Sequence, residues 1–331
     1  MTRTVRFHEL GGPEVLRLED VPVGEPGAGE MLIRVDAIGL NRAEVLFRSG
    51  EYIEPARFPA RLGIEASGLV EAVGADVTGF AIGQPVSVVP AFSMNDYGVY
   101  AERAVVPARA VLRRPDGLDA IAGAAVWMPY LTAYGALVEV GGMRAGDTVV
   151  LTAASSSVGL AAIQVARSVG AVPVAATRTR AKREALLKAG AAEVIVTEED
   201  DVVGRVLELT AGRGAEFVLD AVAGPGVVDL ARVVAPGGTL FLYGALSGRP
   251  TPYPGFDLGM PALNMRTYTL PETTRDPERL RRAEAFVTAG LSTGVFAPVV
   301  DRVFALEEIA EAHRYMEAGS QVGKIVVTVG H

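Results

Sequence analysis

Cysteine is absent from this chain of 331 residues, and histidine is scarce. Without a thiol the chain forms no disulfide, carries no thiolate nucleophile and binds no metal through cysteine. The three histidines are His8, His313 and His331, which lie far apart in the sequence. A catalytic zinc site usually takes three protein ligands, so these scarcities argue against zinc chemistry.

The chain also lacks an excess of positive charge and a long apolar run. Its formal net charge is −8, whereas nucleic-acid binding usually needs a basic face. The N-terminus alternates polar and apolar residues without a hydrophobic signal core. The longest apolar runs, such as residues 121–130, are too short to span a bilayer. We therefore expect a cytoplasmic protein that binds neither nucleic acid nor a membrane.

What the sequence does contain is apolar material for more than one core. Half of the residues are hydrophobic, and at this length two domains are expected. In the first third, short β-rich segments are separated by glycine and proline, which is typical of a compact barrel-like domain. An open sheet packed on its neighbour is the alternative. These segments are residues 4–8, 14–18, 30–37, 69–73 and 85–90.

From about residue 124, predicted strands alternate with predicted helices, which indicates a doubly wound parallel sheet. The six strands are expected at residues 148–153, 172–177, 193–197, 216–219, 239–244 and 265–270. The helices between them are expected at residues 158–169, 181–189, 202–210 and 227–234. The tail, with helices at 277–289 and 309–317 and a strand at 324–329, is expected to rejoin the first domain. The predicted domains are residues 1–123, completed by 275–331, and residues 124–274.

A strand-to-helix turn at residues 151–159 carries the strongest local signal. The three glycine positions of the dinucleotide fingerprint G-x-G-x-x-G hold Ala154, Ser156 and Gly159. Small residues still let the backbone approach a pyrophosphate, which the helix N-terminus attracts. A serine-rich helix cap without a ligand is the alternative. The six-strand context favours a bound dinucleotide.

The end of the second strand of this sheet indicates which dinucleotide is bound. Arg178 stands 19 positions after Gly159, where an NAD site usually places an acidic residue. Lys182 lies one helical turn further on, on the same face. A guanidinium and an ammonium suit the 2′-phosphate of NADPH. We therefore predict NADPH rather than NADH, with a solvated basic helix start as the alternative.

Several segments, in order along nearly the whole chain, form a recognisable set. They are residues 37–41, 48–52, 63–68, 98–102, 129–134, 154–159 with Gln164, and 323–324. Together they resemble the motifs of the zinc-free quinone oxidoreductases, and of their enoyl reductase relatives, in the medium-chain dehydrogenase/reductase superfamily. The resemblance implies an α/β fold with a Rossmann doubly wound parallel sheet plus a GroES-like β-barrel catalytic domain. It also implies a homodimer formed through the Rossmann sheet.

The same resemblance bears on the metal. Zinc-bearing relatives place a cysteine or an equivalent ligand where Asn41 lies, and a His–Glu pair where this chain has Ile64 and Glu65. Glu65 alone cannot make a three-ligand site. We therefore expect no metal, and we interpret Glu65 as a structural hydrogen-bonding residue rather than a catalyst.

Without a Lewis acid, a conjugated acceptor is the easiest target for a hydride, because the product is a delocalised enolate. We therefore predict a reductase of quinones or α,β-unsaturated carbonyl compounds. Tyr52 is the candidate proton donor, since a phenol is neutral at rest and acidic enough to protonate an enolate. The alternatives are that Tyr52 forms only an aromatic wall and that solvent supplies the proton. Asn41 is a candidate to orient the nicotinamide ribose or a substrate oxygen, with loop hydrogen bonding as its alternative.

Further residues are predicted to contact the cofactor or the substrate. The predicted cofactor contacts are Asn41, Thr132, Ser155, Ser156, Ser157, Val158, Thr177, Arg178, Lys182, Gly244 and Lys324. An apolar substrate pocket is expected from Phe92, Met94 and Tyr97, and Trp127, Met128 and Tyr130 fit either that pocket or the core.

Two other functions stay open. One is a metal-free alcohol dehydrogenase or ketoreductase, for which the matched catalytic positions offer no histidine or lysine relay. The other is a non-catalytic nucleotide-binding protein that keeps the fold.

Overall fold

The computed structural model describes residues 1–260 and 262–331. Packing divides the chain into two units, one formed by Met1–Met128 with Pro298–His331 and the other by Pro129–Ala297. The first division falls inside helix α2, Ala120–Ala133. The expected domain boundaries after residues 123 and 274 stay predictions.

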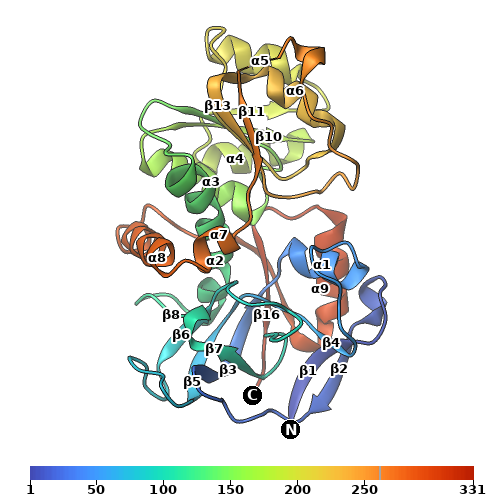
Figure 1. Cartoon of the computed structure of the whole chain (residues 1–331), viewed down its shortest axis with the longest axis vertical. Helices are drawn as coiled ribbons and strands as arrows, with labels where there is room; N and C mark the ends of the chain where they lie inside the picture. Colours follow the sequence, from blue (N-terminus) through green and yellow to red (C-terminus); the bar gives the residue numbers. More distant parts are fainter. Residues whose placement is uncertain (261) are drawn as a thin grey trace. The chain divides into compact units, whose positions relative to one another are not determined.

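The second unit is built on a six-stranded sheet in the order β11-β10-β9-β12-β13-β14, with all neighbours parallel. Figure 1 shows β10, β11 and β13 of this sheet. The strands are β9 (Thr148–Leu151), β10 (Val172–Thr177), β11 (Glu193–Val196), β12 (Ala215–Asp220), β13 (Val234–Leu242) and β14 (Asn264–Thr267). The strand order reverses between β9 and β12, as in the dinucleotide-binding doubly wound fold. The predicted parallel sheet is confirmed.

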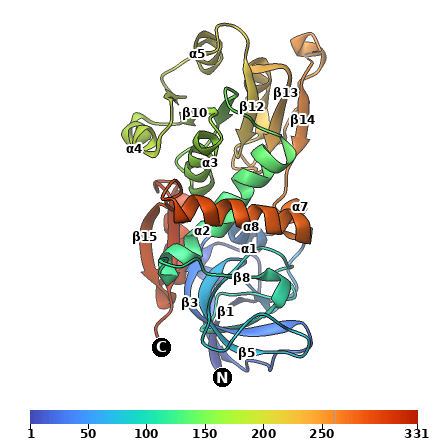
Figure 2. The same cartoon turned by 90° about the vertical axis from the view of Figure 1, so that its left-hand side faces the viewer.

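Helices cover both faces of this sheet. They are α3 (Ser157–Ser168), α4 (Arg183–Ala189), α5 (Val202–Leu209) and α6 (Val227–Arg232). Helices α7 (Pro271–Thr274) and α8 (Pro277–Ser292) follow β14 in the same unit. Right-handed crossovers place α3 and α4 on one face and α5 and α6 on the other, and each of these two pairs is in contact. Figure 2 shows β12, β13 and β14 side by side at one end of the sheet. Because helices cover both faces, the central strands consist mainly of buried residues, many of them β-branched.

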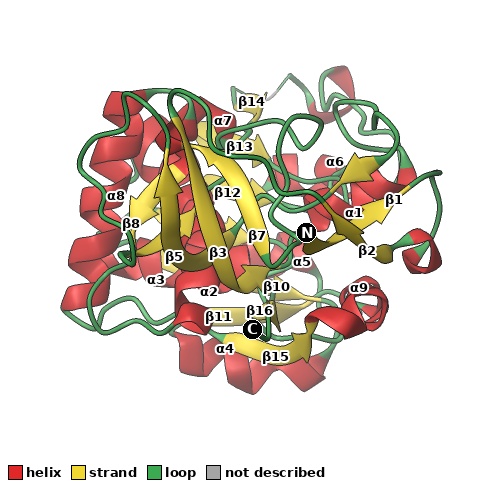
Figure 3. Cartoon of the chain, turned by 90° about the horizontal axis from the view of Figure 1, so that it is seen from below, coloured by secondary structure: helices red, strands yellow, loops and turns green. Residues whose placement is uncertain are grey.

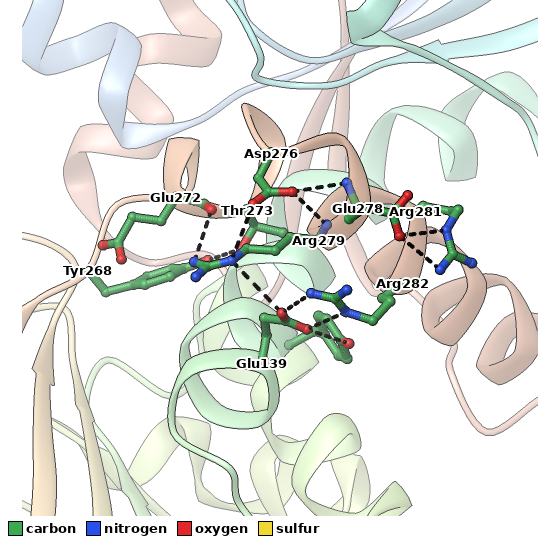
Figure 4. Close-up of polar contacts among 10 residues, drawn as sticks. Glu139, Tyr268, Glu272, Thr273, Asp276, Glu278, Arg279, Arg281 and Arg282 are labelled. Atoms are coloured by element: carbon green, nitrogen blue, oxygen red, sulfur yellow. Dashed lines mark hydrogen bonds and ion pairs between the residues drawn. The ribbon is translucent and has the colours of Figure 1, made fainter.

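A polar cluster ties α8 to a π-helical segment, Tyr134–Val140, that follows α2 (Figure 4). Glu139 in this segment accepts hydrogen bonds from Arg282 at 2.5 and 3.2 Å and from the Tyr134 hydroxyl at 3.1 Å. The Arg282 guanidinium holds the pKa of Glu139 below its ordinary value. Arg279 donates to the backbone oxygen of Glu272, which joins α8 to α7. The cluster therefore has a structural role within the second unit.

The first unit contains two sheets. One has the order β2-β1-β4; the other has the order β15-β16-β3-β5-β6-β8, with β7 paired to β3. Their strands are β1 (Thr2–Phe7), β2 (Arg17–Val21), β3 (Glu30–Gly39), β4 (Ala60–Arg61), β5 (Ala66–Val73), β6 (Pro85–Val88), β7 (Arg103–Pro107), β8 (Val111–Arg113), β15 (Val300–Ala305) and β16 (Lys324–Thr328). Figure 3 shows β3 between β5 and β7. Because β16 pairs with β3, the tail of the chain packs into this unit.

Some local expectations for the first unit differ from the structure. The predicted strand at residues 14–18 begins late, since Pro13–Val15 form a 3₁₀ turn and β2 starts at Arg17. Proline fixes φ and has no N–H to donate, which suits the first position of a turn. Helices α1 (Arg42–Ser49) and α9 (Ile309–Ala318) lie in this unit. Helix α9 was expected, whereas α1 was not.

One helical stretch among the described residues is long and apolar enough to cross a membrane by length and composition alone. It covers Ala120–Val140, and 78% of its most apolar window is buried. A buried core helix passes the same test, so this stretch is weak evidence for a membrane span.

Candidate functional site

The turn between β9 and α3 has the geometry of a phosphate-binding turn. Ser156 is the N-cap of α3, and its hydroxyl accepts a hydrogen bond from the Gly159 N–H at 3.1 Å. Ala153 takes a positive φ of 46°, a conformation that turns the chain sharply after the strand. The remaining N–H groups at the start of this 12-residue helix point out of the N-terminus, where an anion is favoured.

Gly159 is required by the close approach of α3 to the turn. A Cβ at this position would lie 2.4 Å from the backbone oxygen of Ala154 and 2.5 Å from its Cα. The third glycine of the fingerprint was expected to serve this packing role.

We expect Gly159→Ala to lower the free energy of unfolding by about 1–3 kcal/mol, because backbone atoms must move to admit the methyl group. Urea denaturation measures this change. Gly226→Ala is the matched control, since a Cβ there meets no atom within 4 Å, and it should change stability by no more than about 0.5 kcal/mol. Equal stability of the two variants would contradict the packing argument.

The ends of two further strands lie beside this turn. Asp220, the last residue of β12, is fully buried and accepts hydrogen bonds from the Thr152 hydroxyl at 2.5 Å and from the Ala223 N–H at 2.8 Å. Gly244 follows β13, and a Cβ there would lie 2.6 Å from the backbone oxygen of Ala221. Asp220 therefore shapes the carboxyl edge of the sheet, where doubly wound folds bind their ligands.

The end of β10 contributes positive charge. Thr177 is buried, whereas Arg178 is exposed. Lys182 donates to the Ser155 hydroxyl at 3.2 Å, so its ammonium lies at the turn. Arg180, which follows Arg178, forms an ion pair with Glu199. The structure therefore brings Lys182 to the predicted serines and leaves the Arg178 guanidinium on the surface.

In the first unit, Asn41 belongs to a buried polar network. The Lys324 ammonium donates to Asn41 Oδ1 and to Glu65 Oε2, both at 2.6 Å. Glu65 also accepts from the Met128 N–H at 2.7 Å, and Asn41 Nδ2 donates to the Gly39 oxygen at 3.0 Å. Glu65 and Lys324 are 0 and 1% exposed. Glu65 therefore forms a structural ion pair with Lys324.

Glu44 is a member of this network that the sequence interpretation missed. Its carboxylate accepts from the Asn41 N–H at 2.7 Å and, at 3.4 Å, from Asn41 Nδ2 and the Ile64 N–H. Burial raises the pKa of the Glu44 carboxyl to about 7, although the Lys324 ammonium opposes that rise. The signal in the sequence was the spacing Asn41-x-x-Glu44, which is typical of a helix start with a glutamate at its third position.

Tyr52 follows α1 and is half-buried. Its ring meets Phe47 edge to face, with ring centroids 6.0 Å apart. The loop after Tyr52 is held by Asn95, which accepts from the Arg57 N–H at 2.8 Å and donates to the Pro55 oxygen at 2.9 Å. Asn95 therefore ties the segment that follows Tyr52 to the loop in which Asn95 itself lies.

The predicted substrate pocket is only partly consistent with burial. Phe92 and Tyr97 are half-buried, but Met94 is 2% exposed and packs in the core, so its prediction as a pocket residue was wrong. A methionine in an apparent loop gave no sign that the loop folds over the core. Trp127 and Tyr130 are likewise buried, at 0 and 1% exposure.

Three further residues predicted to contact the cofactor lie in helices α2 and α3. Thr132 is buried in α2, and Ser157 and Val158 open α3. No group of three or more His, Asp or Glu side chains in residues 1–260 and 262–331 is arranged to hold a metal ion. Roles of these residues in binding or catalysis stay predictions.

Similarity to known proteins extends over nearly the whole chain. Residues 27–116 match the family described as the alcohol dehydrogenase GroES-like domain, and residues 157–289 match the family described as zinc-binding dehydrogenase. The chain is 34% identical to a quinone oxidoreductase of Pseudomonas aeruginosa over 331 residues, which covers 99% of each chain.

Solved structures show the same likeness. The quinone oxidoreductase of Pseudomonas syringae pv. tomato DC3000 matches with a TM-score of 0.92 and 28% identity over 99% of this chain and 100% of that one. The Escherichia coli quinone oxidoreductase, solved as a complex with NADPH, also matches with a TM-score of 0.92, at 26% identity over 99% of this chain and 100% of that one.

Proposed function

The chain belongs to the quinone oxidoreductase branch of the medium-chain dehydrogenase/reductase superfamily, and on this premise we propose that it transfers a hydride from NADPH to a quinone or another α,β-unsaturated carbonyl compound without a metal. It is an NADPH-dependent oxidoreductase. The class of substrate and the roles of individual residues are our proposal.

The observation that carries the proposal is the turn before α3 together with the positive charge beside it. Gly159 lets the helix start approach closely, and Lys182 already lies within hydrogen-bond distance of Ser155. These residues fit a dinucleotide, with the N–H groups of Ser157 and Val158 toward the pyrophosphate and Arg178 toward a 2′-phosphate. We place Thr177 and Gly244 along the same edge of the sheet. When bound, NADPH supplies the hydride.

Replacing Arg178 by alanine should raise KM for NADPH by roughly 10- to 100-fold, because charge-assisted hydrogen bonds to the 2′-phosphate are lost. KM for NADH, which has no such phosphate, should hardly change. Initial-rate kinetics with both cofactors measure the difference. Arg213→Ala, another exposed arginine of this unit, is the control. Equal changes for the two cofactors would remove Arg178 from the phosphate site.

Two side chains of the first unit, Tyr52 and Asn41, have hydrogen-bonding groups that suit the reduction of a conjugated carbonyl compound. In our proposal Tyr52 supplies the proton that completes reduction after the hydride arrives, since a neutral phenol protonates a developing enolate. Asn41 Oδ1 has a second lone pair beside the one that Lys324 occupies, and we propose that it orients the nicotinamide ribose or the substrate. Glu65 is engaged by Lys324 and Met128, so we assign it no catalytic part.

The same proposal includes a cytoplasmic homodimer formed through the parallel sheet. In the described part of the chain β14 ends the strand order, so one of its edges is available for pairing. Tyr253, Phe256 and Met260, shortly before β14, are 78, 86 and 65% exposed. Exposed apolar side chains in the segment that leads into an edge strand support an interface between two copies.

A panel of acceptors of matched size tests the substrate class. At saturating NADPH we expect turnover of quinones and enones and little turnover of the corresponding saturated ketones, because only the conjugated acceptors form a delocalised enolate. Equal rates on saturated ketones would favour a ketoreductase. Tight NADPH binding without turnover of any acceptor would favour a non-catalytic protein of this fold.

A further inference from the structure

The network around Asn41 has an unequal balance of buried charge. Glu44, Glu65 and Lys324 are each at most 1% exposed, and they comprise two carboxyl groups and one ammonium. Lys324 donates at 2.6 Å to Glu65 and to Asn41, and no hydrogen bond from Lys324 to Glu44 is seen in the described residues. Glu44 is held by neutral donors, the Asn41 and Ile64 N–H groups and the Asn41 amide. A buried carboxylate without a directly bonded cation takes up a proton more readily than one that is bonded to a cation.

The same contacts fix how the Asn41 carboxamide points. Its oxygen faces the Lys324 ammonium, and its nitrogen faces the Gly39 oxygen and the two carboxylates. The two orientations of the Asn41 amide differ in energy here, because a flipped amide would place its NH₂ group against the ammonium. Glu44 also holds the backbone of Asn41 at the start of α1. Asn41 is therefore positioned from two sides, by Lys324 and by Glu44.

We propose that Glu44 is a positioning residue: its carboxylate holds Asn41 in the orientation used for cofactor or substrate, and uptake of a proton by Glu44 loosens that hold and lowers activity. This inference rests on the proposed role of Asn41. Ionised Glu44 offers only acceptors to three donors that face it. Once one oxygen carries a proton, it becomes a donor itself and meets N–H groups that have no lone pair to offer.

The surroundings of Glu44 place this change near neutral pH. Charged and titratable groups near it include Lys324 from β16, Glu65 from the segment before β5 and Tyr100 from the segment before β7. Arg48 lies one turn further along α1. Burial is the largest influence and raises the pKa of Glu44 to about 7, with Lys324 acting against it. Tyr100 stays neutral in this range, because burial raises the pKa of its hydroxyl well above the ordinary value.

The test compares pH profiles of kcat/KM for the wild type, Glu44→Gln and Glu44→Asp between about pH 5.5 and 8.5. We expect the wild type to lose about tenfold in kcat/KM below pH 7, the cost of a lost hydrogen bond to a charged group. Glu44→Gln should have the low value at every pH, because its amide is a permanent donor. Glu44→Asp, which still ionises, should keep an acid limb. Glu9→Gln, at an exposed site, should match the wild type.

Two readouts do not depend on turnover. The infrared difference spectrum between low and high pH should show a carboxylic acid band in the wild type that is missing in Glu44→Gln. NADPH affinity, followed by fluorescence, should weaken more steeply in the wild type than in the variant as the pH is lowered. The 2′-phosphate titrates alike in both proteins. If no conjugated carbonyl is reduced, the proposed function fails while these two readouts still decide the inference. Overlapping pH profiles and the same infrared band in both proteins would overturn it.

Discussion

Replacing Lys324 by methionine should lower the free energy of unfolding by about 3–5 kcal/mol, the usual effect of removing one partner of a buried ion pair. Lys324 is 1% exposed and donates to Glu65 at 2.6 Å, and Glu65 is fully buried. Methionine fills a similar volume, so the loss comes mainly from a carboxylate left without its cation. Chemical denaturation of the purified variant measures the change.

The double variant Lys324→Met/Glu65→Gln separates the charge from the packing. Removing the orphaned carboxylate should restore much of the lost stability, because a neutral amide still accepts from the Met128 N–H. Lys188→Met, at an exposed lysine, is the control and should be nearly neutral. If Lys324→Met were as stable as this control, the Glu65–Lys324 pair would not hold the first unit together.

The second large effect concerns Tyr52. Its replacement by phenylalanine should lower kcat by roughly 10²- to 10⁴-fold, the contribution of a positioned general acid. Phenylalanine keeps the edge-to-face contact with Phe47, and chemical denaturation of the variant checks that its fold is retained. NADPH affinity should also stay the same, since the lost group is the phenol hydroxyl alone. Steady-state rates on a quinone, with NADPH titrated separately, measure both quantities.

A matched control for Tyr52 is available in the same unit. Tyr315→Phe removes a hydroxyl that donates to Asp301 at 2.7 Å, and it should leave kcat unchanged. If Tyr52→Phe kept full activity, the ring would serve as a wall of the pocket and solvent would supply the proton.

The sequence predicted the second unit better than the first. Strand β10 was expected at its observed residues, and α3 within one residue, because buried β-branched runs and glycine-marked helix ends are local signals. Gly159 was also interpreted correctly, since the close approach it permits is a property of the strand–turn–helix itself.

The network in the first unit was less accessible to sequence reasoning. Lys324 meets Asn41 across 283 positions of the chain, and no local pattern predicts such a contact. Glu65 was expected to be structural, but its partner was not identified, and Lys324 was assigned to the cofactor. Glu44 and α1 carried a readable signal, the Asn41-x-x-Glu44 spacing followed by Gly50 with a positive φ of 81°.

The central claim, a metal-free reductase that depends on NADPH, is tested most directly by initial rates on one quinone after dialysis against a chelator. We predict that kcat/KM with NADPH exceeds that with NADH by roughly 10- to 100-fold, and that the chelator changes neither value. Equal use of the two cofactors, or activity that the chelator abolishes and zinc restores, would contradict the account.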